Sequence, residues 1–263
     1  MSYLEQVKNQ IHNLNLECEY WDIRLEDVIE TSIDILDGEV LTCSVSPTVG
    51  AFLRVRKNGF WFYESTTDLQ HLKESLQQLS KQKVSSKTDL AYKPDNKNSF
   101  FKIIYEKDNF SLVSLEEKLN LVKKYDVHIK KEPTLKSCRT IYKDIYKIKS
   151  FINSVGTEFE YDFNQAGIAL RYTLKQGENI FDDKCLFYGS FFKDLQNKED
   201  EIHAAVEESE KFLSAPVVNP GKYKVLFDPE VTGVFTHESF GHKSEADFML
   251  GDLKALEDWK LGS

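Results

Sequence analysis

Two histidines and one glutamate lie close together near the end of this chain of 263 residues, in the run HESFGH at residues 237–242. Neutral imidazoles are common ligands of Zn²⁺, and a neighbouring glutamate can take a proton from the water that fills the open coordination position. Many zinc hydrolases hold two such histidines, four residues apart, on one helix. The run therefore offers His237 and His242 as metal ligands and Glu238 as a general base.

The two histidines are five residues apart here, and this spacing constrains the helix that carries them. On an ideal α-helix they would point about 140° apart, too far to share one ion. A wider π-type turn, or a break at Gly241, would bring them together. Histidines beside acidic residues also occur on ordinary surface helices, so a solvated helix without metal is the competing interpretation. Glu245 and Asp247 follow closely and are either further oxygen ligands or part of that solvated face.

The helix that must position the motif is expected to begin at Asp228 and Pro229. Aspartate is a good N-cap, and proline suits the first helical position. Just before it, residues 223–227 (YKVLF) are predicted to form a short strand. Residues 197–213 form the clearest amphipathic helix of the chain, with apolar side chains along one side.

The earlier part of the chain has the pattern of an antiparallel sheet. Asp37-Gly38 and Asn58-Gly59 are typical of hairpin turns, each between two strand-like stretches. Strands are expected at residues 19–25, 31–36, 40–45, 51–56, 60–63, 135–149, 157–163, 167–174 and 185–192.

Three amphipathic helices are expected to cover this sheet. The first begins at Leu4, the second follows Asp68, and the third follows Ser114, where Glu117 completes a capping box. The polar residues 80–99 are expected to be a mobile connection. We therefore predict an α+β fold: a twisted, largely antiparallel sheet with helices on one face, ending in the motif-bearing helix.

Composition narrows the classes of function. With 34 basic and 43 acidic residues, the formal net charge is −9, which disfavours a protein that grips nucleic-acid backbones. No apolar run is long enough for a membrane span, and the first residues lack the pattern of a signal peptide. We therefore predict a cytoplasmic protein with no membrane or nucleic-acid partner. The four cysteines are far apart in the sequence and, in a cytoplasmic protein, are expected to be free thiols.

Several segments resemble one known family. Around the motif these are LSAP at residues 213–216, GKY at 221–223 and DPE at 228–230, which lead into HESFGHKSEADF. Upstream, residues 24–26, 30–32, 37–38, 50–56, 58–59, 65–69 and 153–156 follow the family pattern in order. Together they resemble the TldD/PmbA metallopeptidases, often called modulators of DNA gyrase, along nearly the whole chain.

This resemblance implies a zinc metallopeptidase that acts on peptides and unfolded segments. His237 and His242 match the zinc-binding histidines, and Glu238 matches the catalytic glutamate. Ser239 stands where alanine is common in the family, a small change beside the metal. Because the motif is present, the chain resembles the catalytic TldD type and not the partner subunit that lacks it. The family also implies a homodimer or a heterodimer with a related subunit.

The chain departs from the family in length. Members are much longer, so the C-terminal half of the family fold is absent here, and with it the cysteine that serves as third zinc ligand; none of the four cysteines matches that position. We expect an N-terminal α+β domain over residues 1–195 and the start of the metallopeptidase domain over residues 196–263. The chain is then a fragment, an interrupted gene product or one piece of a split enzyme. The alternative is a non-catalytic binding or assembly module.

Overall fold

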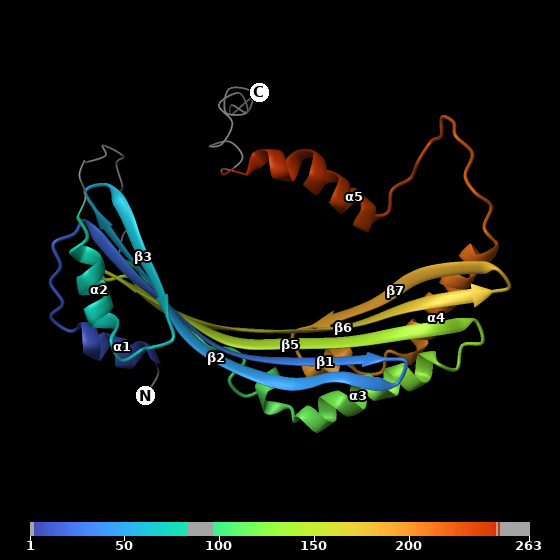
Figure 1. Cartoon of the computed structure of the whole chain (residues 1–263), viewed down its shortest axis with the longest axis horizontal. Helices are drawn as coiled ribbons and strands as arrows, with labels where there is room; N and C mark the ends of the chain where they lie inside the picture. The colour runs from blue at the N-terminus through green and yellow to red at the C-terminus, as the bar shows by residue number, and fades with distance from the viewer. Residues whose placement is uncertain (1–2, 84–96, 246, 248–263) are drawn as a thin grey trace. The chain divides into compact units, whose positions relative to one another are not determined.

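A curved sheet of seven strands carries most of the chain, as Figure 1 shows for the computed structural model, which describes residues 3–83, 97–245 and 247. The strand order is β3-β2-β1-β5-β6-β4, and β7 pairs with β6. The strands are β1 Tyr20–Leu36, β2 Glu39–Lys57, β3 Phe60–Thr66, β4 Ser99–Lys102, β5 Leu135–Asn153, β6 Glu158–Gln176 and β7 Asn179–Gly189. All neighbours run antiparallel except β4, which is parallel to β6. The predicted α+β fold class is confirmed.

The strands are longer than the sequence pattern indicates. The two stretches expected at residues 19–25 and 31–36 are one strand, β1, and those at 40–45 and 51–56 are one strand, β2. The intervening residues lack a clear apolar alternation. They are held as strand because β1 is hydrogen-bonded to β2 on one side and to β5 on the other along nearly its whole length.

The turn between β1 and β2 is the predicted Asp37-Gly38 hairpin. Both residues have positive φ, 51° and 93°, as a tight two-residue hairpin requires. Gly38 is also close to the end of a helix: a Cβ atom there would lie 2.4 Å from Lys130 Nζ. The Lys130 ammonium is the end of a flexible side chain and can move aside, so the positive φ is what favours glycine at this position.

Four helices lie on the same face of the sheet, its convex side in Figure 1. They are α1 Tyr3–Ile11, α2 Leu72–Ser80, α3 Leu115–Ile129 and α4 Glu199–Glu210. Helices α1 and α2 pack on Ile23 and Leu53 at one end, whereas α3 and α4 pack on the other end around Tyr142. The prediction that helices cover one face is confirmed.

The helix starts follow local capping chemistry. At α3, Ser114 and Glu117 form the predicted capping box, with each side chain bonded to the other's backbone N–H. The helix expected directly after Asp68 begins later, at Leu72, because Asp68 instead accepts bonds from the Gln70 backbone N–H and the His71 ring and holds the chain in a turn. Of the polar connection expected at residues 80–99, residues 84–96 lie outside the described residues.

The chain divides into two compact units, Met1–Ala215 and Pro216–Ser263. Helix α4, placed by the sequence analysis in the second domain, packs in the structure within the first unit through Ile202 and Val206. The family domain boundary after residue 195 stays a prediction. None of the described helices is long and apolar enough to cross a lipid bilayer.

The second unit begins with a stretch that has no regular structure. The strand predicted at residues 223–227 does not form: no described strand pairs with it, and Leu226 is 98% exposed. Apolar alternation alone does not make a strand, because the backbone needs a hydrogen-bonding neighbour. Helix α5, Pro229–Thr236, then starts as expected, with Asp228 Oδ1 accepting a bond of 2.8 Å from the Val231 backbone N–H.

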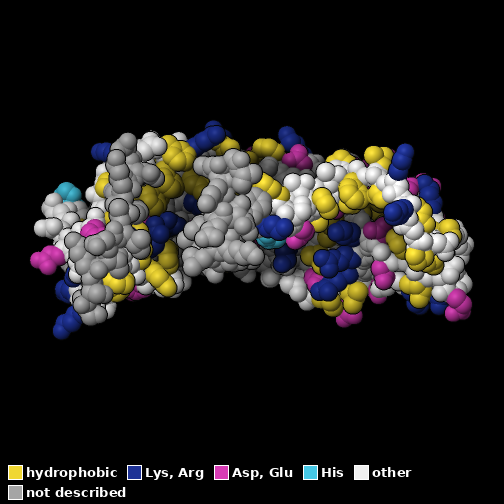
Figure 2. Space-filling model, turned by 90° about the horizontal axis from the view of Figure 1, so that it is seen from above, with side chains coloured by type: hydrophobic (Ala, Val, Ile, Leu, Met, Phe, Trp, Pro, Cys, Tyr) yellow, Lys and Arg dark blue, Asp and Glu magenta, His cyan; other side chains and the backbone are white. Residues whose placement is uncertain are grey.

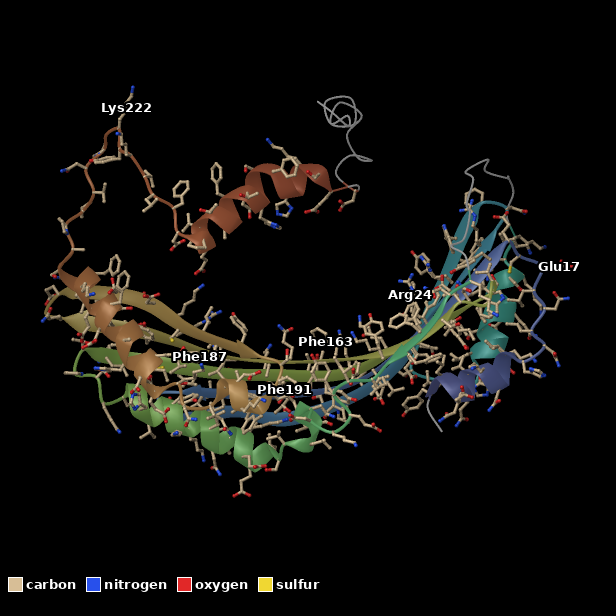
Figure 3. All side chains as sticks on the ribbon, turned by 180° about the vertical axis from the view of Figure 1, so that it is seen from behind. Glu17, Arg24, Phe163, Phe187, Phe191 and Lys222 are labelled. Carbon is tan, nitrogen blue, oxygen red and sulfur yellow. The ribbon has the colours of Figure 1, made fainter. Side chains whose placement is uncertain are left out.

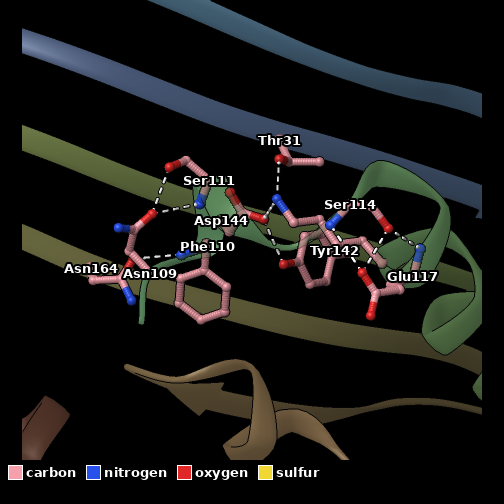
Figure 4. Close-up of polar contacts among 10 residues, drawn as sticks. Thr31, Asn109, Phe110, Ser111, Ser114, Glu117, Tyr142, Asp144 and Asn164 are labelled. Carbon is pink, nitrogen blue, oxygen red and sulfur yellow. Dashed lines mark hydrogen bonds and ion pairs between the residues drawn. The ribbon is translucent and has the colours of Figure 1, made fainter. Parts of the chain in front are cut away.

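A buried ion pair joins α3 to the middle of the sheet (Figure 4). Lys118 Nζ lies 2.7 Å from Asp144 Oδ2 and donates to Thr31 Oγ1 at 2.8 Å, and Tyr142 donates its hydroxyl proton to the same carboxylate oxygen at 2.5 Å. The side chains of Lys118 and Asp144 are 2% and 0% exposed. Burial, together with the Asp144 charge, raises the pKa of Tyr142, so the phenol stays protonated and remains a donor.

We expect Lys118→Met to lower the free energy of unfolding by about 3–5 kcal/mol, because it leaves the Asp144 carboxylate buried without its counter-charge. Urea denaturation measures this loss. The matched control is Lys123→Met on the exposed side of the same helix, with an expected change within about 0.5 kcal/mol. Adding Asp144→Asn to Lys118→Met removes the unpaired charge and should recover part of the loss. Equal stability of the Lys118 and Lys123 variants would contradict the assignment.

The four cysteines are free thiols, as predicted, and they differ in burial. Burial raises the pKa of Cys138 and of Cys185 to about 11. At pH 8 both are therefore protonated and poor nucleophiles. In the native protein, iodoacetamide should label the half-buried Cys43 well before Cys138 or Cys185, and urea should abolish the difference; peptide mass spectrometry gives the order. Labelling of Cys138 as fast as Cys43 in native protein would show that the sheet interior opens readily.

Candidate metal centre

The candidate ligands follow directly from helix α5. The chain leaves α5 through a π-helical turn, His237–Gly241, and continues into a short 3₁₀ turn, His242–Ser244. In the π turn, the His242 backbone N–H donates to the carbonyl oxygen of His237, five residues earlier. This adds one residue to the turn, which offsets the five-residue spacing of the histidines. The predicted local widening of the helix is confirmed.

The widened turn brings the two imidazoles and the carboxylate together. The ring centroids of His237 and His242 are 4.4 Å apart, at an interplanar angle of 65°. One ligand atom each from His237, Glu238 and His242 can be chosen so that all lie within 4.8 Å of one another. The alternative route, a break at Gly241, is not used: Gly241 has a right-handed φ of −56° that any residue adopts.

A second carboxylate orients one of the rings. Glu245 Oε1 lies 2.7 Å from His242 Nδ1, while Glu238 Oε2 lies 3.7 Å from the other ring nitrogen, Nε2. Carboxylates that hold one nitrogen of a metal-binding histidine fix its tautomer and leave the other nitrogen for the ion. In this structure Glu245 is therefore placed as an orienting residue and not as a ligand. Asp247 is exposed, and it is not part of the group of ligand atoms formed by the described residues.

The surroundings of the motif are open. The side chains of Glu238 and His242 are 64% and 42% exposed. A shallow cavity of about 640 Å³ borders the turn, lined by Phe227, Thr232, Phe240 and others, and of the three candidate residues only His237 lines it. The three residues thus share a cluster, whereas the described part of the unit does not enclose them in one pocket.

The residues present fit a divalent metal in kind but not in number. Two imidazoles with a neighbouring carboxylate are the donor set of many zinc hydrolases, and a catalytic zinc normally has three protein ligands. The ligand group found among the described residues contains no cysteine. All four cysteines belong to the first unit.

Comparison with known proteins now adds to this geometry. Residues 21–84 match the model of the PmbA/TldA metallopeptidase domain 1. Over 240 residues the chain is 24% identical to a metalloprotease of Archaeoglobus fulgidus, covering 90% of this chain and 55% of the relative. It is also 24% identical to the zinc metalloprotease TldD homolog of Saccharolobus solfataricus, over 94% of this chain and 55% of the relative. The chain is thus similar to the TldD/PmbA metallopeptidases along most of its length.

The fold agrees with this relationship. The crystal structure of a Bacteroides thetaiotaomicron protein named as a modulator of DNA gyrase superposes with a TM-score of 0.68 at 16% identity, covering 92% of this chain and 56% of that one. The chain spans about half the length of the curated relatives it matches. The matched family model ends at residue 84, well before the HESFGH run.

Sequence reasoning missed the orienting role of Glu245. It noted this residue only as a further oxygen ligand or as part of a solvated face. The spacing could have indicated this role. Glu245 follows His242 by three residues, and on a helical turn side chains three residues apart are neighbours, so its carboxylate reaches the His242 ring.

We expect Glu245→Ala to weaken zinc binding by about tenfold, because His242 loses the carboxylate that holds its Nδ1. Competition with a chromophoric chelator measures the affinity. The control is Glu230→Ala, which removes an exposed carboxylate of α5 outside the ligand group. If the two variants bind zinc equally well, Glu245 does not orient the ring.

Proposed function

We propose that this chain is the N-terminal portion of a zinc-dependent metallopeptidase that acts on peptides or unfolded segments. The observation that carries the proposal is the π turn, which gathers His237, Glu238 and His242 at ligand distance. The proposal is also supported by the relatives of this chain, which are named metalloprotease and zinc metalloprotease. The four free thiols agree with a reducing compartment, and we place its action in the cytoplasm.

His237 and His242 would hold the ion, and Glu245 would keep His242 in the tautomer that carries its proton on Nδ1. Zinc bound there would supply a Lewis acid for the scissile carbonyl and make a water more acidic. Glu238 lies beside His242 Nε2, so its carboxylate is within reach of a water at the ion and would accept the proton of that water. The same carboxyl would then pass the proton to the leaving amine.

We propose further that the third ligand and the substrate-binding walls come from polypeptide outside these 263 residues. Two imidazoles alone hold zinc weakly, since much of the affinity of zinc sites depends on anionic ligands. Large apolar side chains are also exposed along the second unit, among them Val217, Leu226, Val234, Phe235 and Phe240. A stretch this apolar is typical of a surface that another part of a protein covers.

The proposed partners are a peptide or unfolded protein as substrate, and a second subunit, either a copy of this chain or a related one. Nucleic acid and membrane are not among them. The net charge of −9 supports the exclusion of nucleic acid.

The test is to purify the chain, add one equivalent of zinc, and measure affinity and the hydrolysis of an unfolded peptide by mass spectrometry. We expect one weakly held zinc, little or no turnover, and a loss of affinity greater than about tenfold in His237→Ala and in His242→Ala. His203→Ala, an exposed histidine of α4, is the control. Zinc binding that neither motif variant weakens would overturn the metal site.

The catalytic part of the proposal has its own discriminating variant. Glu238→Gln keeps the size of the side chain but cannot accept the proton, so any turnover should disappear while zinc remains bound. Sub-nanomolar zinc binding with turnover that Glu238→Gln abolishes would show that the third ligand is local. The proposal that the third ligand lies outside this chain would then be wrong, whereas the proposal that the chain is a peptidase would be supported.

A second candidate function is a non-catalytic binding or assembly module. The observation that favours it is the ligand group itself, which offers two imidazoles and no cysteine among the described residues. Hydrolysis sensitive to Glu238→Gln would exclude it.

A further inference from the structure

The face of the sheet opposite helices α1–α4 is not covered by any described helix of the first unit, and we call it the open face (Figure 1). Side chains alternate between the two faces along a strand. Residues such as Ile33 and Tyr142 are buried under the helices, so their neighbours along each strand lie on the open face. The open face therefore presents even-numbered residues of β1 and odd-numbered residues of β5 and β6. Arg24 and Phe163, labelled in Figure 3, belong to it.

A row of aromatic rings crosses this face. Phe151 of β5 stacks on Phe159 of β6 with centroids 4.8 Å apart, and Phe159 stacks on Phe100 of β4 at 5.4 Å. On the other side of Phe151, the Arg24 guanidinium lies 5.9 Å from its ring centroid. Phe52 pairs with Arg24 across the strands and so continues the row. Phe100 is 44% exposed, so the row offers apolar surface to a partner.

Cations gather on the same face in excess of carboxylates. Ion pairs already join Asp22 to Arg24 and Arg54, Asp34 to Arg139, and Glu26 to Lys149. Further cations of this face make no ion pair with a described residue: Lys102, Lys143, Lys147, Arg171 and Lys184. Figure 2 shows dark-blue and yellow side chains side by side in this view. This mixture stands out in a chain whose net charge is −9.

We propose that the open face binds an extended, acidic segment of polypeptide that carries aromatic or other apolar side chains. Carboxylates of the segment would pair with the cations around Lys143 and Lys147, and its apolar side chains would stack on the aromatic row. The rings and cations recur across neighbouring strands, a spacing that suits an extended chain lying over the sheet. This surface belongs to the first unit alone and does not depend on the metal centre.

Single-stranded nucleic acid is the alternative ligand most similar to an acidic polypeptide, because it also binds to open sheet surfaces that carry aromatic rings and cations. The distribution of charge favours the polypeptide. Glu26, Glu30 and Asp34 line one strand of the same face, between the cations of its neighbours. A continuous phosphate backbone would meet these carboxylates, whereas a polypeptide can place neutral residues opposite them.

The experiment uses fluorescence anisotropy with three labelled probes of equal length, without metal. They are an unstructured peptide of Glu, Phe, Gly and Ser, the same peptide with Lys for Glu, and an oligothymidylate. We expect the acidic peptide to bind most tightly, at least about tenfold better than the other two, and to weaken with added salt. Tighter binding of the oligothymidylate, or equal binding of both peptides, would overturn the proposal.

Matched variants locate the binding surface. The double variant Lys143→Glu, Lys147→Glu should lower the affinity for the acidic peptide by about tenfold or more. The control is Lys123→Glu with Lys131→Glu, which makes the same charge change on exposed lysines outside the open face. It should change this affinity less than about twofold. Phe100→Ser should also weaken binding of the acidic peptide, and Leu112→Ser, at an exposed apolar position in a different segment, should not. Circular dichroism checks that each variant is folded. Equal effects of the two lysine pairs would show that binding follows net charge and not this face.

Discussion

The strict alternation of side chains along the long strands is the constraint on which the first unit depends. Helices α1–α4 all pack on one face, so alternate residues of β1 and β5 beneath them, such as Ile23, Ile33 and Tyr142, belong to the core. The residues between them are then held on the opposite face in fixed register across the sheet. Burial on one side thus aligns Arg24, Phe151 and Phe159 in a row on the other.

The same constraint explains the polar interior under α3. The strands run through the sheet without interruption, and Asp144 faces the helix side at a position between two apolar clusters. A carboxylate there is stable only with a counter-charge and hydrogen-bond donors, which Lys118 and Tyr142 supply. The ion pair also fixes α3 at one place along the sheet, because a shift of the helix by one residue would separate the charges.

The geometry of the second unit is determined differently. Among its described residues, apolar side chains such as Leu226 and Phe235 are exposed, so the backbone of one turn, and not a core, sets the geometry of the histidines. The π turn arranges His237 and His242 without help from packing, through one backbone hydrogen bond and the Glu245 carboxylate. A local device of this kind can bring two imidazoles and a carboxylate together. A pocket that holds a substrate in line needs walls from further elements.

The sequence by itself determined the local chemistry: the Asp37-Gly38 hairpin, the Ser114 capping box, the start of α5 at Pro229 and the need for either a wider turn or a break between the histidines. Each depends on residues only a few positions apart, so their types are sufficient. Tertiary structure decided the rest. The continuity of β1 and β2 comes from pairing with distant strands, and residues 223–227 lack such a neighbour and remain irregular. The side-by-side placement of Phe100, Phe151 and Phe159 was likewise not predictable, because strand register joins residues far apart in the chain.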